Sequence, residues 1–187
     1  MIYISKGILK NSLSNADIQV GHNGLTHHLK KKEAELWVQG SIGFAYAKNA
    51  IEEHVLINLE KIGVVELEHE EQDTSKYRLL TRCICCATVK KYIPLSLKRD
   101  EKRLYTWICK AGLRLSMAEL TYLMEYYVVP LEFYLGEENR QHLVERIYIQ
   151  RNIADNLLEI QMEHAIKRDD TVRIIEQLIK KKYIMLM

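Results

Sequence analysis

Four cysteines are the residues of this sequence best suited to metal binding or nucleophilic attack, and three of them stand together in the segment CICC. On a strand, Cys83 and Cys85 would share one side and Cys86 the other, with Cys109 in a later helix. Structural zinc sites commonly use two C-x2-C pairs, and this sequence does not contain two of them. Because free cysteine is among the most buried residue types, we expect these thiols to pack in the core and to bind no metal.

Other patterns that carry catalysis are absent from the sequence. It contains no G-x-S-x-G, Walker A, dinucleotide-binding glycine or H-E-x-x-H motif. Its acidic pairs, such as Glu52 with Glu53 and Glu137 with Glu138, are adjacent residues, so their carboxylates do not face each other as hydrolytic pairs do. We therefore predict a protein that is not an enzyme and carries no cofactor.

Clustered lysine and arginine residues are the remaining groups with a recognisable chemistry, which is the binding of phosphate. They lie in KYRLLTR, in the linker TVKKYIPLSLKRDEKR and in the last predicted helix. The alternative is that they are solvated surface charges, or, at the C-terminus, cations that complement a helix dipole. The candidate nucleic-acid contacts are Lys76, Arg78, Lys98, Arg99, Arg173, Lys180 and Lys181.

A helix followed by two short strands is predicted in the first half of the chain. In NAIEEHVLINLEKIG, Asn49 and Glu52 have the spacing of a capping box, and Gly63 suits a helix end. The expected buried face carries Ile51, Val55, Leu59 and Ile62. The following VVELE and KYRLLTR have β-prone patterns on either side of the polar HEEQDTS, which predicts a hairpin. An earlier helix is expected in HHLKKKEAELWVQG, ending at Gly40.

The second half repeats parts of this order. Ser116 and Glu119 form another possible capping box before AELTYLMEYYV. DDTVRIIEQLIKKKYIMLM predicts an amphipathic helix, with Val172, Ile175 and Ile179 inward, that runs into a strand. Between these elements, ENRQHLVERIY and IADNLLEIQMEHAIKR are expected to be inserted helices.

On these segments the chain resembles the winged helix-turn-helix superfamily of many bacterial transcription regulators, over roughly 26–85 and more loosely from 116 to the end. The resemblance implies an α+β, mostly α fold, with a winged-helix domain at 1–95 and a helical, winged-helix-like domain at 96–187. It also implies that a third helix enters the DNA major groove. In the first domain that helix would expose Glu52, Glu53 and Glu60, which repel phosphate, so the second domain is the better candidate.

Composition sets few limits on partners. Lys and Arg number 27 against 25 Asp and Glu, for a net charge of +2, so bulk charge does not indicate a polyanion partner. The richest apolar window, LTYLMEYYVVPLEFYL, is interrupted by charges and proline, and no secretory leader is recognisable. We therefore expect a cytoplasmic protein that does not enter a membrane.

Tyrosine, methionine and the inserted helices suggest an interface. Eleven tyrosines are present, and several share TYLMEYYVVPLEFYL with methionine and phenylalanine. Such residues are enriched at protein interfaces, although they also build ordinary cores. Because the inserted helices are apolar on more than one face, we expect a homo-oligomer about a two-fold axis. The predicted interface residues are Tyr126, Tyr127, Leu143, Ile147, Leu157 and Met162.

The leading hypothesis is therefore a dimeric transcriptional regulator that binds double-stranded DNA through its second domain and linker. The alternative is a protein–protein interaction adaptor built on winged-helix domains, which acidic recognition helices would suit. A basic surface that joins Lys98 and Arg99 to Lys180 and Lys181 favours the first, and scattered cations beside an apolar surface favour the second.

Overall fold

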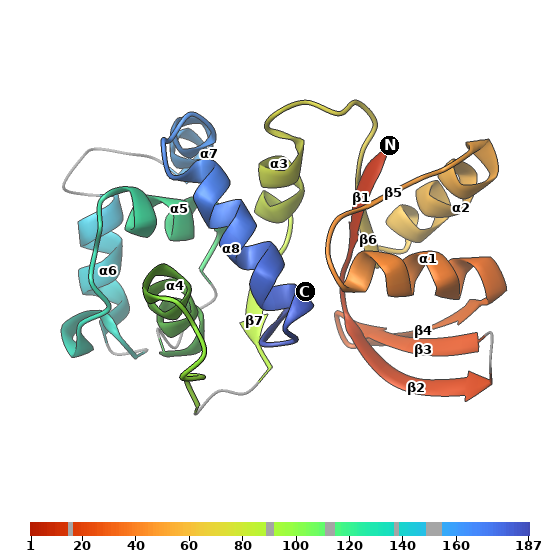
Figure 1. The fold of residues 1–187 in the computed structure, drawn as a ribbon, viewed down its shortest axis with the longest axis horizontal. Coiled ribbons are helices and arrows are strands. Elements are labelled where there is room, and N and C mark those ends of the chain that lie inside the picture. The colour runs from red at the N-terminus through yellow and green to blue at the C-terminus, as the bar shows by residue number, and fades with distance from the viewer. Residues whose placement is uncertain (15–16, 89–91, 111–114, 137–138, 149–154) are drawn as a thin grey trace.

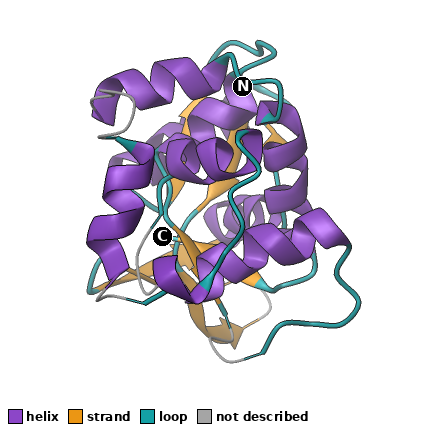
Figure 2. Cartoon of the chain, turned by 90° about the vertical axis from the view of Figure 1, so that its left-hand side faces the viewer, coloured by secondary structure: helices purple, strands orange, loops and turns teal. Residues whose placement is uncertain are grey.

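The computed structural model describes residues 1–14, 17–88, 92–110, 115–136, 139–148 and 155–187. They form an α+β fold with two side-by-side units, as Figure 1 shows. Strands are concentrated in the N-terminal unit. The C-terminal unit, which faces the viewer in Figure 2, is mainly helical. The predicted α+β class is confirmed, and the winged-helix arrangement within it stays a prediction.

The N-terminal unit contains two small antiparallel sheets. In the first, β1 (Ile2–Ser5) lies between β5 (Ala45–Tyr46) and β6 (Val65–Glu68). In the second, β2 (Ile8–Ser14), β3 (Asp17–His22) and β4 (Leu25–Lys30) form a meander. Helix α1 (Lys31–Ser41) contacts β1, β3 and β4, so it joins the two sheets.

Helix α2 (Ala50–Lys61) begins and ends where the sequence predicts, but it buries a different face. The Asn49 side chain accepts a hydrogen bond from the Glu52 backbone N–H at 3.0 Å, and Gly63 has a φ of +79°. The predicted stripe is wrong at Ile51 and Ile62, which are exposed, whereas Leu56 is fully buried. The helix also buries Glu52, whose carboxylate accepts the Lys48 N–H and pairs with Lys32.

The predicted wing is wrong in its second strand. KYRLLTR lies in helix α3 (Ser75–Thr81), and β6 pairs with β1, so the two segments do not form a hairpin. Ser75 favours the helix, because its hydroxyl accepts the Gln72 N–H at 2.8 Å and donates to the Glu70 carbonyl. Tyr77 and Leu80, three residues apart, are buried on one side of this helix.

The C-terminal unit surrounds the long helix α8 (Arg168–Lys180), which α3, α4 (Arg99–Lys110) and α5 (Met117–Glu125) contact. The remaining elements are η1 (Glu132–Tyr134), α6 (Arg140–Ile147) and α7 (Asp155–Glu163), together with β7 (Cys85–Ala87) paired to β8 (Ile184–Leu186). The capping box of Ser116 and Glu119 is confirmed. The inward positions Val172, Ile175 and Ile179 and the final strand are confirmed too.

Two clusters of buried side chains divide the chain between β6 and α3. The smaller cluster lies in the N-terminal unit, and the larger one contains α3, β7 and the C-terminal unit together with Ile2 and Ile4 from β1. The two cores therefore separate between β6 and α3, before residue 95. The predicted division into two domains at residue 95 stays a prediction. At the junction, the Gly7 N–H donates to the Leu186 carbonyl at 2.8 Å.

Candidate nucleic-acid interface

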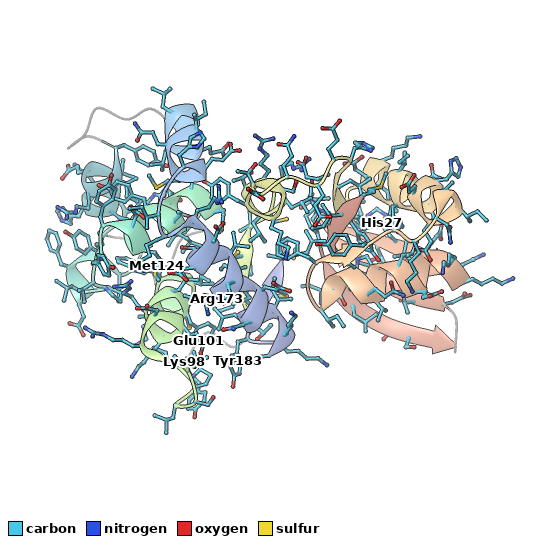
Figure 3. The ribbon with its side chains drawn as sticks, turned by 45° about the horizontal axis from the view of Figure 1, so that its top comes forward. His27, Lys98, Glu101, Met124, Arg173 and Tyr183 are labelled. Carbon is cyan, nitrogen blue, oxygen red and sulfur yellow. The ribbon has the colours of Figure 1, made fainter. Side chains whose placement is uncertain are left out.

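The start of α4 and the end of α8 lie together, although about eighty residues separate them. Glu101, in the first turn of α4, makes the connection. Its carboxylate accepts the backbone N–H of Lys98 at 2.9 Å and the ammonium of Lys181 at 3.1 and 3.2 Å. Figure 3 shows Lys98, Glu101 and Tyr183 at this meeting point. The structure therefore brings Lys98 at the start of α4 and Lys181 at the end of α8 close together.

Glu101 is buried and ionised. Burial alone would raise its pKa, but the hydrogen bond from the Lys98 backbone and the contact with the Lys181 ammonium outweigh burial, and they hold the pKa of the carboxyl below its usual value. One carboxylate therefore holds the Lys181 ammonium beside the backbone of Lys98.

Five exposed cations make up what we call the α4–α8 basic surface. In the part of the chain that the structure describes, the side chains of Lys98, Arg99 and Lys102 have no hydrogen-bonding or ion-pair partner. A cation without a carboxylate partner is free to bind a phosphate. The members of the surface are Lys98, Arg99, Lys102, Lys181 and Lys182.

Lys180 does not belong to this surface. Its ammonium pairs with Glu176 at 2.6 Å, and its side chain lies close to Gly43 of the N-terminal unit. Adjacent helical residues point about 100° apart, so Lys180 and Lys181 at the end of α8 have different neighbours. Of the four cations whose joining would favour DNA binding, Lys180 therefore lies outside the α4–α8 basic surface.

Lys76, Arg78 and Arg173 lie elsewhere. The predicted shared strand face of Lys76 and Arg78 is wrong, because both are on helix α3, where residues two apart diverge. Lys76 lies over the Phe44 ring, and Arg78 pairs with Glu163 at 2.6 Å. Arg173 pairs with Asp170 at 2.8 Å. Arg78 and Arg173 are thus already bound to carboxylates, and none of the three lies on the α4–α8 basic surface.

The predicted interface residues divide into core and surface. Leu143 and Ile147 are fully buried and Met162 is 4% exposed, so the prediction that they contact a partner is corrected, because the chain's own core occupies them. Tyr127 and Leu157 are 60% and 49% exposed. Tyr126 is also exposed, and with Ile160 and Ile166 it lines an open groove of about 810 Å³ beside α7. Residues 149–154 of the inserted segment lie outside the described residues.

Two of the four cysteines occupy core positions, and Cys86 and Cys109 are half-buried. Cys83 and Cys85 are buried, and burial raises the pKa of the Cys83 thiol to about 12 and that of Cys85 higher still. Thiols in this state are poor nucleophiles at neutral pH. Among the described residues, no three His, Cys, Asp or Glu side chains are placed to hold a metal ion.

Three tyrosines that the sequence interpretation did not select lie next to the basic surface. Tyr92, Tyr105 and Tyr183 line a pocket of about 350 Å³ with Pro94, Leu95 and Ser96. The signal in the sequence is weak, because the three rings are far apart along the chain. The one hint in the sequence is that Tyr92 and Tyr183 each follow a cluster of lysines.

No known protein family, curated protein or solved structure matches this chain. Across the described ranges, every helix is too short or too polar to cross a membrane.

Proposed function

We propose that the chain is a non-enzymatic DNA-binding protein with a role in transcription regulation, and that the α4–α8 basic surface contacts the phosphate backbone. The observation that carries this proposal is that Glu101 holds the Lys98 backbone at the start of α4 beside the Lys181 ammonium at the end of α8. The whole chain has a net charge of only +2, so five exposed cations beside two carboxylates, Asp100 and Glu101, are a local excess of positive charge.

The charge-reversal variant Lys98→Glu with Arg99→Glu should weaken binding to a short DNA duplex by at least about tenfold at low salt. It should also reduce the slope of log affinity against log salt by about two, since each lost phosphate contact contributes about 0.9. Fluorescence anisotropy of a labelled duplex at several salt concentrations measures both quantities.

Lys30→Glu with Lys31→Glu is the matched control. Lys30 with Lys31 and Lys98 with Arg99 are both pairs of adjacent, exposed residues at the start of a helix. Acidic side chains are favourable at that end of a helix, so neither double variant should unfold the protein. Equal losses in the two variants would mean that binding follows net charge and not this surface. Unchanged binding in the Lys98 and Arg99 variant would remove the surface from the DNA contact.

The groove beside α7 supports the second candidate function, an adaptor, and also the proposed homodimer. Ile160 and Ile166 are 57% and 87% exposed beside Tyr126, an apolar surface of the kind that marks protein contacts. For this groove we propose a second copy of the chain as the occupant, packed about a two-fold axis as in most homodimers.

Ile160→Asp should convert a dimer into a monomer, because a buried carboxylate without a partner is costly. Sedimentation velocity at micromolar concentration measures the mass, which is 22.0 kDa for one chain. The exposed residue Ile51 of α2 provides a control, and Ile51→Asp should leave the dimer intact. A monomeric parent protein would contradict the homodimer.

A further inference from the structure

The tyrosine pocket beside the basic surface has the chemistry of a nucleobase site. Tyr105 is almost fully buried and forms part of its wall, with its ring centroid 6.0 Å from that of Tyr183 and the two planes tilted by 53°. Tyr92 is 58% exposed and Leu95 is 90% exposed at the open side. A volume of about 350 Å³ is at the lower end of the roughly 300–1,000 Å³ that ligand pockets occupy, which suits one small flat group.

Cations flank this pocket on both of the segments that build it. Lys98 follows the pocket residue Ser96 by two positions, and Lys182 immediately precedes Tyr183. The segment around Tyr183 is held in place by Thr88, whose hydroxyl lies within hydrogen-bonding distance of the carbonyls of Lys182 and Tyr183, at 2.8 and 2.9 Å. A strand whose phosphates lie on the basic surface would therefore pass the opening of an aromatic pocket.

We infer that this pocket receives an unpaired base of a single-stranded nucleic acid whose backbone lies on the α4–α8 basic surface. The inference rests on the proposed function and narrows it to strands with accessible bases. Paired bases in a duplex present only their edges, whereas an unpaired base can offer its face to an aromatic ring. Stacking on Tyr92 and burial against Leu95 would add an attraction that phosphate contacts alone do not provide.

Polar groups at the pocket would bind the edge of the base. The hydroxyls of Ser96 and Tyr183 are 3.4 Å apart, and each can donate and accept a hydrogen bond. Hydroxyl groups that both donate and accept suit every base, so the pocket should select for an unpaired base more strongly than for a particular sequence.

The test compares a short thymidine strand that carries one central 2-aminopurine with a fully paired hairpin of similar length. The full-length protein should bind the strand more tightly than the hairpin, and stacking should change the 2-aminopurine fluorescence. Tyr92→Ala should weaken binding of the strand roughly 5- to 100-fold and leave binding of the hairpin unchanged. Tyr92→Phe keeps the ring and should bind the strand like the parent protein. Tyr92 is exposed, so neither change should affect folding.

The outcomes separate this inference from the proposed function. If Tyr92→Ala and Leu95→Ala bind the strand like the parent protein while the Lys98 and Arg99 charge reversal weakens both ligands, the pocket has no role and the basic surface stands. If the parent protein binds the strand no more tightly than the hairpin, an unpaired base adds no attraction and the inference is overturned. If the parent protein binds neither ligand, the proposed function fails and the inference fails with it.

Discussion

Glu119→Ala should lower the free energy of unfolding by about 2–4 kcal/mol, because it removes a buried carboxylate that joins three parts of the C-terminal unit. One carboxylate oxygen accepts the Ser116 N–H at 2.8 Å and completes the capping box of α5. The other accepts hydrogen bonds from Arg140 and Tyr148, both at 3.2 Å. Without Glu119, the partly buried Arg140 guanidinium loses its carboxylate partner.

Two variants separate these contributions in urea denaturation. Ser116→Ala removes only the side-chain cap and should cost about 1 kcal/mol. Glu119→Gln keeps a carbonyl oxygen of similar reach but removes the charge, so its effect should fall between those of the other two. If Glu119→Ala costs no more than Ser116→Ala, the contacts with Arg140 and Tyr148 do not stabilise the fold.

Gly7→Ala should lower the free energy of unfolding by about 2–4 kcal/mol, since it combines backbone strain with a collision. Gly7 has a φ of +101°, which residues with a side chain rarely adopt. An added Cβ would lie 2.8 Å from the Gly21 carbonyl oxygen and 2.9 Å from the Val20 side chain. Because the Gly7 N–H donates to Leu186, the shift needed to relieve this collision would also disturb the junction between the two units.

Gly24→Ala is the matched control for this prediction. Gly24 has a φ of +78°, but an added Cβ would meet no atom within 4 Å. It should therefore show the backbone strain without the collision, at about 1 kcal/mol. Equal changes in the denaturation midpoints of the two variants would show that close packing around Gly7 is not important for stability.

The sequence by itself determined the elements whose signals are local. The capping interactions of Asn49 and Ser116, the positive φ of Gly63 and the inward face of α8 all depend on residues a few positions apart. Hydrogen bonds at helix ends and the 3.6-residue helical period involve residues only a few positions apart. The sequence therefore predicts these features without knowledge of the elements that pack against the helix.

Tertiary structure decided the points at which partners come from far along the chain. The segment KYRLLTR alternates like a strand, but β6 pairs with β1 and not with this segment. The segment forms a helix instead, and Tyr77 and Leu80 pack from one side of that helix into the larger core. Similarly, α2 buries Glu52, and its countercharge Lys32 comes from α1, which the local pattern does not reveal.

The candidate site divides in the same way. The sequence identified Lys98, Arg99 and Lys181 as cations. It did not show which of these cations form an ion pair with a carboxylate. Only the fold placed Glu101 between Lys98 and Lys181, turned Lys180 toward Glu176, and brought Tyr92 and Tyr183 to one pocket. The physical reason is that charge and aromatic character belong to single residues, whereas a binding surface depends on distances between residues that only the packed chain determines.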